Sequence, residues 1–274
     1  MKVSGDLQKM VVTPSSPVTY ELPVGGEMVT LNPFIGRKLT LVHSGEIHCI
    51  ACGRKTSKSF NQGYCFPCMR SLARCDSCIV RPEQCHFDQG TCREPDWAEA
   101  NCLQPHYVYL ANSSGAKVGI TRGSQIPTRW IDQGAVAALP ILKVSNRLIA
   151  GLVEVVIKKN VSDRTDWRRM LKGQPDPVDF TALRADLLAA GEKDLDKLEQ
   201  RFGSDALVRM EDDAVTEISY PVENYPAKVS SLNFDKTPEV SGILQGIKGQ
   251  YLIFDSGVIN IRKFGGYHVT CNAD

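Results

Sequence analysis

The sequence predicts an α+β fold, in which a small α/β core follows a cysteine-rich insertion and a β-rich, barrel-like part is built from both chain ends. Three observations support this prediction. Residues 107–173 read as two strands followed by helices, most of the cysteines fall between residues 49 and 102, and both chain ends are rich in short strands. We therefore divide the chain into segments 1–47, 48–106, 107–173, 174–214 and 215–274.

The N-terminal segment reads as strands over residues 17–47. Turn residues at Gly25-Gly26 and Asn32-Pro33 separate its β-prone runs. So few strands are marginal by themselves. We therefore expect residues 1–47 to share one barrel or sheet with the C-terminal segment, with the cysteine-rich and α/β parts inserted between them.

Four cysteines at the start of the second segment have the spacing of a zinc site. Cys49-x2-Cys52 and Cys65-x2-Cys68 are separated by twelve residues. Each pair can bring two thiolates to one tetrahedral ion from a single tight turn. The spacing predicts a structural zinc ion bound by all four thiolates. Zinc knuckles also bind proteins, so a protein partner at this segment is a further hypothesis.

A second set of metal-binding side chains follows, and it exceeds the needs of one tetrahedral ion. Its members are Cys75, Cys78, Cys85, His86, Cys92, Cys102 and His106. We expect a second zinc ion here, with Cys75 as a rival for one position of the favoured set Cys78, Cys85, Cys92 and Cys102. Disulfides are the alternative, but residues 1–10 contain no signal peptide, and the paired spacing suits metal better.

The third segment carries residues suited to cleaving a phosphodiester. A strand with Tyr109 is followed by a polar turn, a strand that ends at Thr121, and Arg129 eight residues later. Hydrolysis needs an activated water, positive charge near the phosphate and usually a divalent cation. Tyr109 could orient or deprotonate the water, Arg129 could hold the phosphate, and Glu154 could bind Mg²⁺ or Mn²⁺. Taken singly, Tyr109 and Glu154 could equally be ordinary strand and helix residues.

This ordered set resembles the GIY-YIG nuclease superfamily over about residues 106–172. The resemblance implies a GIY-YIG-like core in which Tyr109, Arg129 and Glu154 are catalytic, together with Tyr107 and Lys117. The match has departures, since Tyr-Val-Tyr replaces Gly-Ile-Tyr and Lys117 replaces a tyrosine, as Lys-Ile-Gly does in a divergent branch. The histidine that often follows the arginine helix has no counterpart. The whole chain also looks like an uncharacterised bacterial family known only as a domain of unknown function.

Charge is distributed unevenly along the chain. Residues 107–173 hold eleven Lys or Arg against four Asp or Glu, whereas residues 174–226 hold five against thirteen. The basic excess predicts nucleic-acid binding by the core, although a solvated helix face would also explain part of it. The residues expected to contact nucleic acid are Thr121, Arg122, Lys158 and Lys159.

The last two segments read as an acidic helical region and then strands. Pro175-Asp176-Pro177 breaks the chain before the acidic helix. The expected strands, with glycines at sharp bends, cover Thr216–Val222, Lys228–Phe234, Gly242–Phe254, Val258–Arg262 and Tyr267–Thr270. With 42% hydrophobic residues and no long apolar run, we expect a cytoplasmic protein without a membrane partner.

Two function classes follow from these observations. The first is a metal-dependent endonuclease that acts on DNA or structured RNA. The second is a non-catalytic nucleic-acid- or ribosome-binding protein with the same fold. The ordered set Tyr109, Arg129 and Glu154 favours the first, whereas Lys117 and the missing histidine favour the second.

Overall fold

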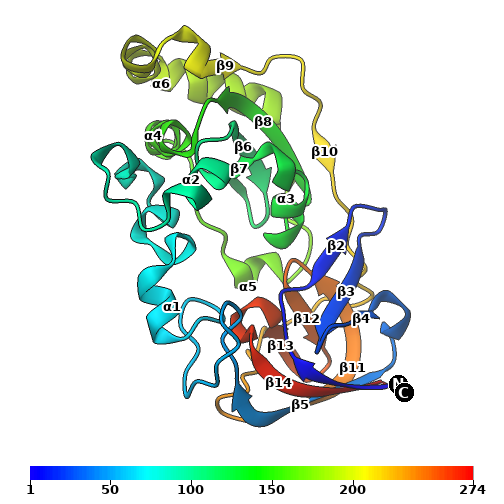
Figure 1. Ribbon diagram of the computed structural model, residues 1–274. Helices are drawn as coiled ribbons and strands as arrows, with labels where there is room; N and C mark the ends of the chain where they lie inside the picture. The colour runs from blue at the N-terminus through cyan, green and yellow to red at the C-terminus, as the bar shows by residue number, and fades with distance from the viewer. Residues whose placement is uncertain (274) are drawn as a thin grey trace.

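Strands from both ends of the chain form one antiparallel sheet in the computed structural model, which describes residues 1–273 (Figure 1). In spatial order the strands are β1 (Lys2–Asp6), β14 (Tyr267–Ala273), β5 (Lys38–Ile47), β11 (Glu239–Lys248), β12 (Tyr251–Phe254) and β13 (Gly257–Asn260). The termini lie side by side, because the amino group of Met1 donates a hydrogen bond to the carbonyl oxygen of Ala273 (2.7 Å).

This sheet is open, so the predicted barrel is wrong although the two chain ends do pair. Within residues 1–273, β1 and β13 lie at opposite ends of the strand order and do not pair with each other. Closure requires every strand to have two neighbours. The strand expected at Lys228–Phe234 is instead a loop that meets β13 through a single bridge between Ser231 and Val258.

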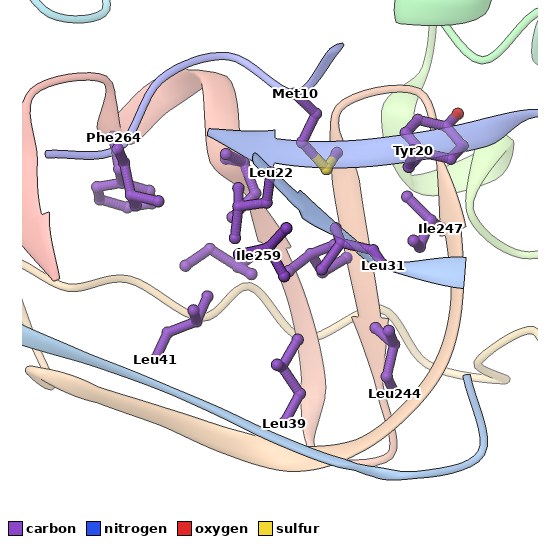
Figure 2. Close-up of a cluster of buried hydrophobic side chains, with 14 of the residues drawn as sticks. Met10, Tyr20, Leu22, Leu31, Leu39, Leu41, Leu244, Ile247, Ile259 and Phe264 are labelled. Carbon is purple, nitrogen blue, oxygen red and sulfur yellow. The ribbon is translucent and has the colours of Figure 1, made fainter. Parts of the chain in front are cut away.

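A second sheet covers the open face of the first. It consists of β2 (Val11–Thr13), β3 (Thr19–Val24) and β4 (Glu27–Thr30). Figure 2 shows the apolar side chains that meet between the two sheets. The buried residues labelled there are Met10, Tyr20, Leu22, Leu31, Leu39, Leu41, Leu244, Ile247, Ile259 and Phe264. Burial of these side chains stabilises the two-layer packing, since apolar area removed from water is favourable.

The middle of the chain forms a second module around a smaller antiparallel sheet. Its strands are β6 (His106–Asn112), β7 (Ala116–Arg122), β8 (Ala137–Val144), β9 (Leu207–Arg209) and β10 (Thr216–Glu217). Its helices are α3 (Thr128–Asp132), α4 (Arg147–Ile157) and α6 (Phe180–Phe202), whereas α5 (Trp167–Met170) packs against β12 and β13 of the first sheet. Helices α4 and α6 pack on one face of the sheet, which leaves the opposite face of the β6–β7 hairpin for α3. No helix among the described residues is long and apolar enough to cross a membrane.

The cysteine-rich segment runs along one side of both parts of the molecule (Figure 1). It contains α1 (Phe66–Ser71), α2 (Pro95–Asn101), η2 (Ala73–Cys75), η3 (Ser77–Ile79), η4 (Pro82–Gln84) and η5 (Phe87–Gln89). The remaining 3-10 helices are η1 (Asn32–Phe34), η6 (Gly123–Gln125), η7 (Ser204–Ala206) and η8 (Ile261–Phe264). A Cβ atom on Gly151 of α4 would lie 2.5 Å from Pro82 Cβ, so α4 and η4 touch through a glycine. The segment is thereby held against the helix that carries Glu154.

Candidate functional site

A cavity of about 940 Å³ lies between the cysteine-rich segment, the second module and the pair of sheets built from both chain ends, which we call the chain-end part. The cysteine-rich segment forms one wall and the second module forms another. The chain-end part contributes Lys9 and Arg262. Four of the predicted catalytic residues line this cavity: Tyr109, Lys117, Arg129 and Glu154. Thr121 and Arg122, predicted to contact nucleic acid, line it as well.

Tyr109 occupies its place because the residue opposite it is a glycine. The two residues face each other across the β6–β7 hairpin, and a Cβ atom on Gly119 would lie 2.6 Å from the Tyr109 hydroxyl. The fully buried ring packs against Trp130, with 5.8 Å between ring centroids, and the hydroxyl donates a hydrogen bond to Gln133 Oε1 (3.1 Å). Burial raises the pKa of Tyr109, although the charge of Arg129 opposes this effect.

Lys117 projects from the same face of β7 as Gly119, because side chains two residues apart on a strand share a face. Only 5% of Lys117 is exposed, and burial lowers its pKa to about 8. The charge of Arg129 lowers this pKa further, whereas that of Glu154 raises it. These influences place the three charged groups within electrostatic range of one another inside the cavity.

Glu154 shares the cavity with a second carboxylate, Asp163, which the sequence reasoning did not anticipate. Asp163 reaches the cavity because the chain returns to the edge of β7, where Val118 N donates a hydrogen bond to Ser162 O (2.8 Å). Burial raises the pKa of Glu154, and the negative charge of Asp163 raises it further. Two neighbouring carboxylates are a donor set that suits a hard divalent cation, because a cation between them would offset their repulsion.

Three charged groups of the cavity, Lys117, Arg129 and Glu154, are free of internal ion pairs among residues 1–273. Two others do have partners: Lys9 pairs with Asp132, and Asp76 pairs with Arg93. Asp163 pairs only with exposed or half-exposed partners at 3.8–3.9 Å. A buried charge without a partner is unfavourable. The cavity therefore offers positive and negative groups that a ligand could pair.

Further basic residues complete the cavity wall from distant parts of the chain. Arg147 donates a hydrogen bond from Nη2 to Ile79 O (2.6 Å), and Arg122 Nη1 donates to Asn101 Oδ1 (2.5 Å). Arg262, from η8, is partly buried, and this burial lowers its pKa. Arg147 belongs to the basic segment 107–173, so the charge count included it. No local sequence pattern connects Arg262 to the β6–β7 hairpin.

Three of the residues predicted to be catalytic or to contact nucleic acid do not line this cavity. Tyr107 borders a separate, smaller pocket beside Gly123. Lys158 and Lys159 do not line the cavity and form ion pairs with Asp163 (3.9 Å) and with Asp194 of the acidic helix α6 (2.7 Å). Lys159 and Tyr107 are thus apart from the four catalytic candidates, whereas Lys158 lies one helical turn after Glu154 and follows it outside the cavity lining.

The first cysteine set converges on one point. The Sγ atoms of Cys49, Cys52, Cys65 and Cys68 all lie within 4.8 Å of one another. The sulfur atoms of Cys52 and Cys65 are 3.8 Å apart. A tetrahedral zinc ion with Zn–S bonds of about 2.3 Å requires sulfur atoms about 3.8 Å apart. The pKa of Cys49 is lowered, because hydrogen bonds from backbone N–H groups outweigh its burial, so a thiolate is favoured there. The four cysteines therefore fit a zinc ion.

The second cysteine set does not converge in the same way. Between residues 75 and 106, the group whose ligand atoms lie within 4.8 Å of one another is Asp76, Cys78 and His86. Cys75 faces the cavity instead. Burial raises the pKa of Cys78 to about 11, and nearby negative charges add to this effect, including those of Cys85, Cys92 and Cys102. These thiols are neighbours, but the four favoured ligands are not gathered as tightly as the first set.

Comparison with known proteins identifies a family and no characterised relative. The profile of a family described as "Protein of unknown function (DUF2797)" matches residues 36–269. No curated protein and no solved structure matches the chain.

Proposed function

Since the chain belongs to the DUF2797 family of proteins of unknown function, we propose a function from the cavity itself: a nucleic-acid-binding zinc protein whose GIY-YIG-like core is a Mg²⁺-dependent endonuclease for DNA or structured RNA. The observation that carries this proposal is that Lys117, Arg129 and Glu154 share one cavity with Tyr109 and form no ion pair. A phosphate and a divalent cation would supply the missing opposite charges.

Each side chain has a role in this proposal. Arg129 and Lys117 bind the phosphate and stabilise the charge that develops on its oxygens. Glu154 and Asp163 would hold the cation, which would supply positive charge to polarise the phosphate and to favour deprotonation of the attacking water. The Tyr109 hydroxyl donates a hydrogen bond to Gln133 Oε1, so its oxygen can accept a hydrogen bond from the attacking water. Because burial raises the pKa of Tyr109, it orients this water rather than deprotonating it.

The zinc assignment rests on the four sulfur atoms of the first cysteine set. Their spacing suits a tetrahedral zinc ion. Bound zinc would fix the loops between Cys49 and Cys68, and residues of this stretch form part of the cavity wall. We assign this zinc a structural role, because four thiolates leave no position for a substrate.

A second candidate is a non-catalytic nucleic-acid- or ribosome-binding protein. Lys117 stands where the superfamily motif has a tyrosine, and the basic groups in the cavity can bind phosphate without any chemical step. In this second candidate function, Arg129 and Lys117 still bind phosphate, whereas Tyr109 and Glu154 have no catalytic role.

The two candidates are separated by incubating the purified protein with labelled branched DNA, single-stranded DNA and structured RNA, with and without Mg²⁺. Glu154→Gln should abolish cleavage and leave binding in place, since it removes the charge but keeps the shape. Arg129→Ala should lower the cleavage rate about a hundredfold or more. The matched controls Glu192→Gln and Arg201→Ala change exposed residues of α6 and should cleave like the parent.

Each result decides between the readings. Cleavage that depends on Mg²⁺ and Glu154 supports the endonuclease. Binding without cleavage, weakened by Arg129→Ala, supports the second candidate. Absence of binding to every nucleic acid at low salt would overturn both.

A further inference from the structure

Two histidines and an aspartate meet on the chain-end part of the molecule, apart from the cavity and from the four-cysteine group. Asp6 ends β1, His268 lies beside it on β14, and His48 directly follows β5. His48 Nδ1 lies 2.9 Å from Asp6 Oδ1, and His268 Nδ1 lies 3.1 Å from the same oxygen. The backbone fixes this meeting, because His48 N donates a hydrogen bond to Gly266 O (2.7 Å).

The separations match those of ligands around a metal ion. An ion with bonds of about 2.1 Å holds neighbouring ligand atoms about 3.0 Å apart when their bonds form a right angle. The ligand atoms of Asp6, His48 and His268 all lie within 4.8 Å of one another, so one ion could reach all three. Hydrogen bonds from the two imidazoles to one carboxylate would give similar distances, and the experiment below separates these cases.

The surroundings allow an ion and water to enter. The side chains of Asp6, His48 and His268 are 39%, 26% and 35% exposed. A further carboxylate, Glu46, lies two residues before His48 and forms an ion pair with Lys55. The three side chains of the cluster are therefore accessible to an ion from solvent.

We propose that Asp6, His48 and His268 bind one divalent first-row transition-metal ion, with water in its remaining coordination positions. Two imidazoles and one carboxylate suit Fe²⁺, Co²⁺, Ni²⁺ or Zn²⁺, whereas Mg²⁺ and Ca²⁺ prefer sites made of oxygen ligands alone. Three protein ligands leave positions open, unlike the closed four-cysteine group. The site is independent of the proposed nuclease activity, because none of its three residues lines the cavity.

The test is a titration with Co²⁺, followed by calorimetry and visible absorption. The titration is carried out in excess Mg²⁺, which would occupy the carboxylates of the cavity. Under these conditions, protein that retains its cysteine-bound metal should bind one further Co²⁺ whose spectrum lacks thiolate charge-transfer bands. Asp6→Asn and His268→Gln should each weaken this binding at least about tenfold. Two matched controls should bind like the parent: His43→Gln, whose ring hydrogen-bonds to the backbone of His268, and His86→Gln in the separate Asp76–Cys78 cluster.

A measurement on the unaltered protein guards against variants that fail to fold. Co²⁺ is paramagnetic, so among the five histidines it should broaden or shift the imidazole proton signals of His48 and His268 most strongly. One of these two signals should be missing from His48→Gln and the other from His268→Gln. The proposal is overturned if no Co²⁺ binds beyond the cysteine-bound metal, if His86→Gln rather than His268→Gln removes binding, or if the affected signals belong to other histidines.

Discussion

Replacing Gly119 by alanine should push Tyr109 out of the cavity wall. The new Cβ atom would lie 2.6 Å from the Tyr109 hydroxyl and 2.7 Å from Cζ. Because carbon atoms in contact are usually about 3.5–4.0 Å apart, the overlap is about 1 Å. Tyr109 is fully buried and packs against Trp130 on one side, so its ring can move only into the cavity that it lines.

The expected decrease in the free energy of unfolding has two sources, overpacking and the loss of a hydrogen bond. Overpacking of a well-packed interior costs about 1–3 kcal/mol. Displacement of the ring also breaks the hydrogen bond from Tyr109 to Gln133, which contributes about 0.5–1.5 kcal/mol. We therefore expect Gly119→Ala to lower the free energy of unfolding by about 2–4 kcal/mol. Under the proposed endonuclease function, nucleic-acid cleavage should fall as well, because the displaced hydroxyl would not orient the attacking water.

A double-mutant cycle followed by urea unfolding measures whether the two residues are coupled. Tyr109→Leu removes the ring, so Gly119→Ala should cost much less in that background than in the parent. Tyr107→Leu is the matched control, since Tyr107 lies against Gly123 rather than Gly119, and in its background the cost should be unchanged. An equal cost of Gly119→Ala in the Tyr109→Leu and parent backgrounds would refute the proposed steric reason for this glycine.

Three further outcomes are expected. Cys68→Ser should remove one zinc ion per chain by elemental analysis and loosen the loops around Cys49, whereas Cys271→Ser, in the sheet, should leave the zinc content unchanged. Because the pKa of Lys117 is about 8, its charged form prevails below that pH. Nucleic-acid affinity should therefore fall as pH rises through about 8, and Lys117→Arg should flatten that profile; an identical profile for the two proteins would contradict the phosphate-binding role. Burial also lowers the pKa of Lys248 to about 8 in the folded state, below its unfolded value. Between about pH 8 and 10.4 the unfolded state therefore binds one more proton than the folded state. The free energy of unfolding of the parent, relative to that of Lys248→Met, should rise by up to about 3 kcal/mol across this window, as measured by urea unfolding. A difference between the two proteins that stays constant with pH would contradict this.

The sequence predicted the local parts of the site because they depend on neighbouring residues. The alternating strands and polar turn place Tyr109 opposite Gly119, and the Cys-x2-Cys spacing predicts the convergence of four thiolates. Both features need only a hairpin or a tight turn. The GIY-YIG-like identity of the core and its chemistry stay predictions.

The remaining features depend on contacts between distant parts of the chain, which a single sequence does not specify. Arg262 and Lys9 reach the cavity only because the chain ends fold beside the hairpin. Asp6 and His268 meet because β1 pairs with β14. Glycine bends were read as closure of a barrel, whereas a separate three-stranded sheet covers the open face and buries the same apolar side chains. Alternation along a strand fixes which face is buried but not what covers it.

The charges of the cavity argue against a simple packing defect of the fold. Burial raises the pKa of Glu154 and lowers that of Lys117, so the surroundings of each side chain disfavour its charged form. Direct pairing of the two would relieve part of this cost, yet they form no ion pair within residues 1–273. The β6–β7 hairpin carries Lys117, α4 carries Glu154 and α3 carries Arg129, so the fold holds these groups apart. Such an arrangement costs stability unless a ligand brings both an anionic group for Lys117 and Arg129 and a cation for Glu154, as a phosphodiester with a bound divalent ion would do.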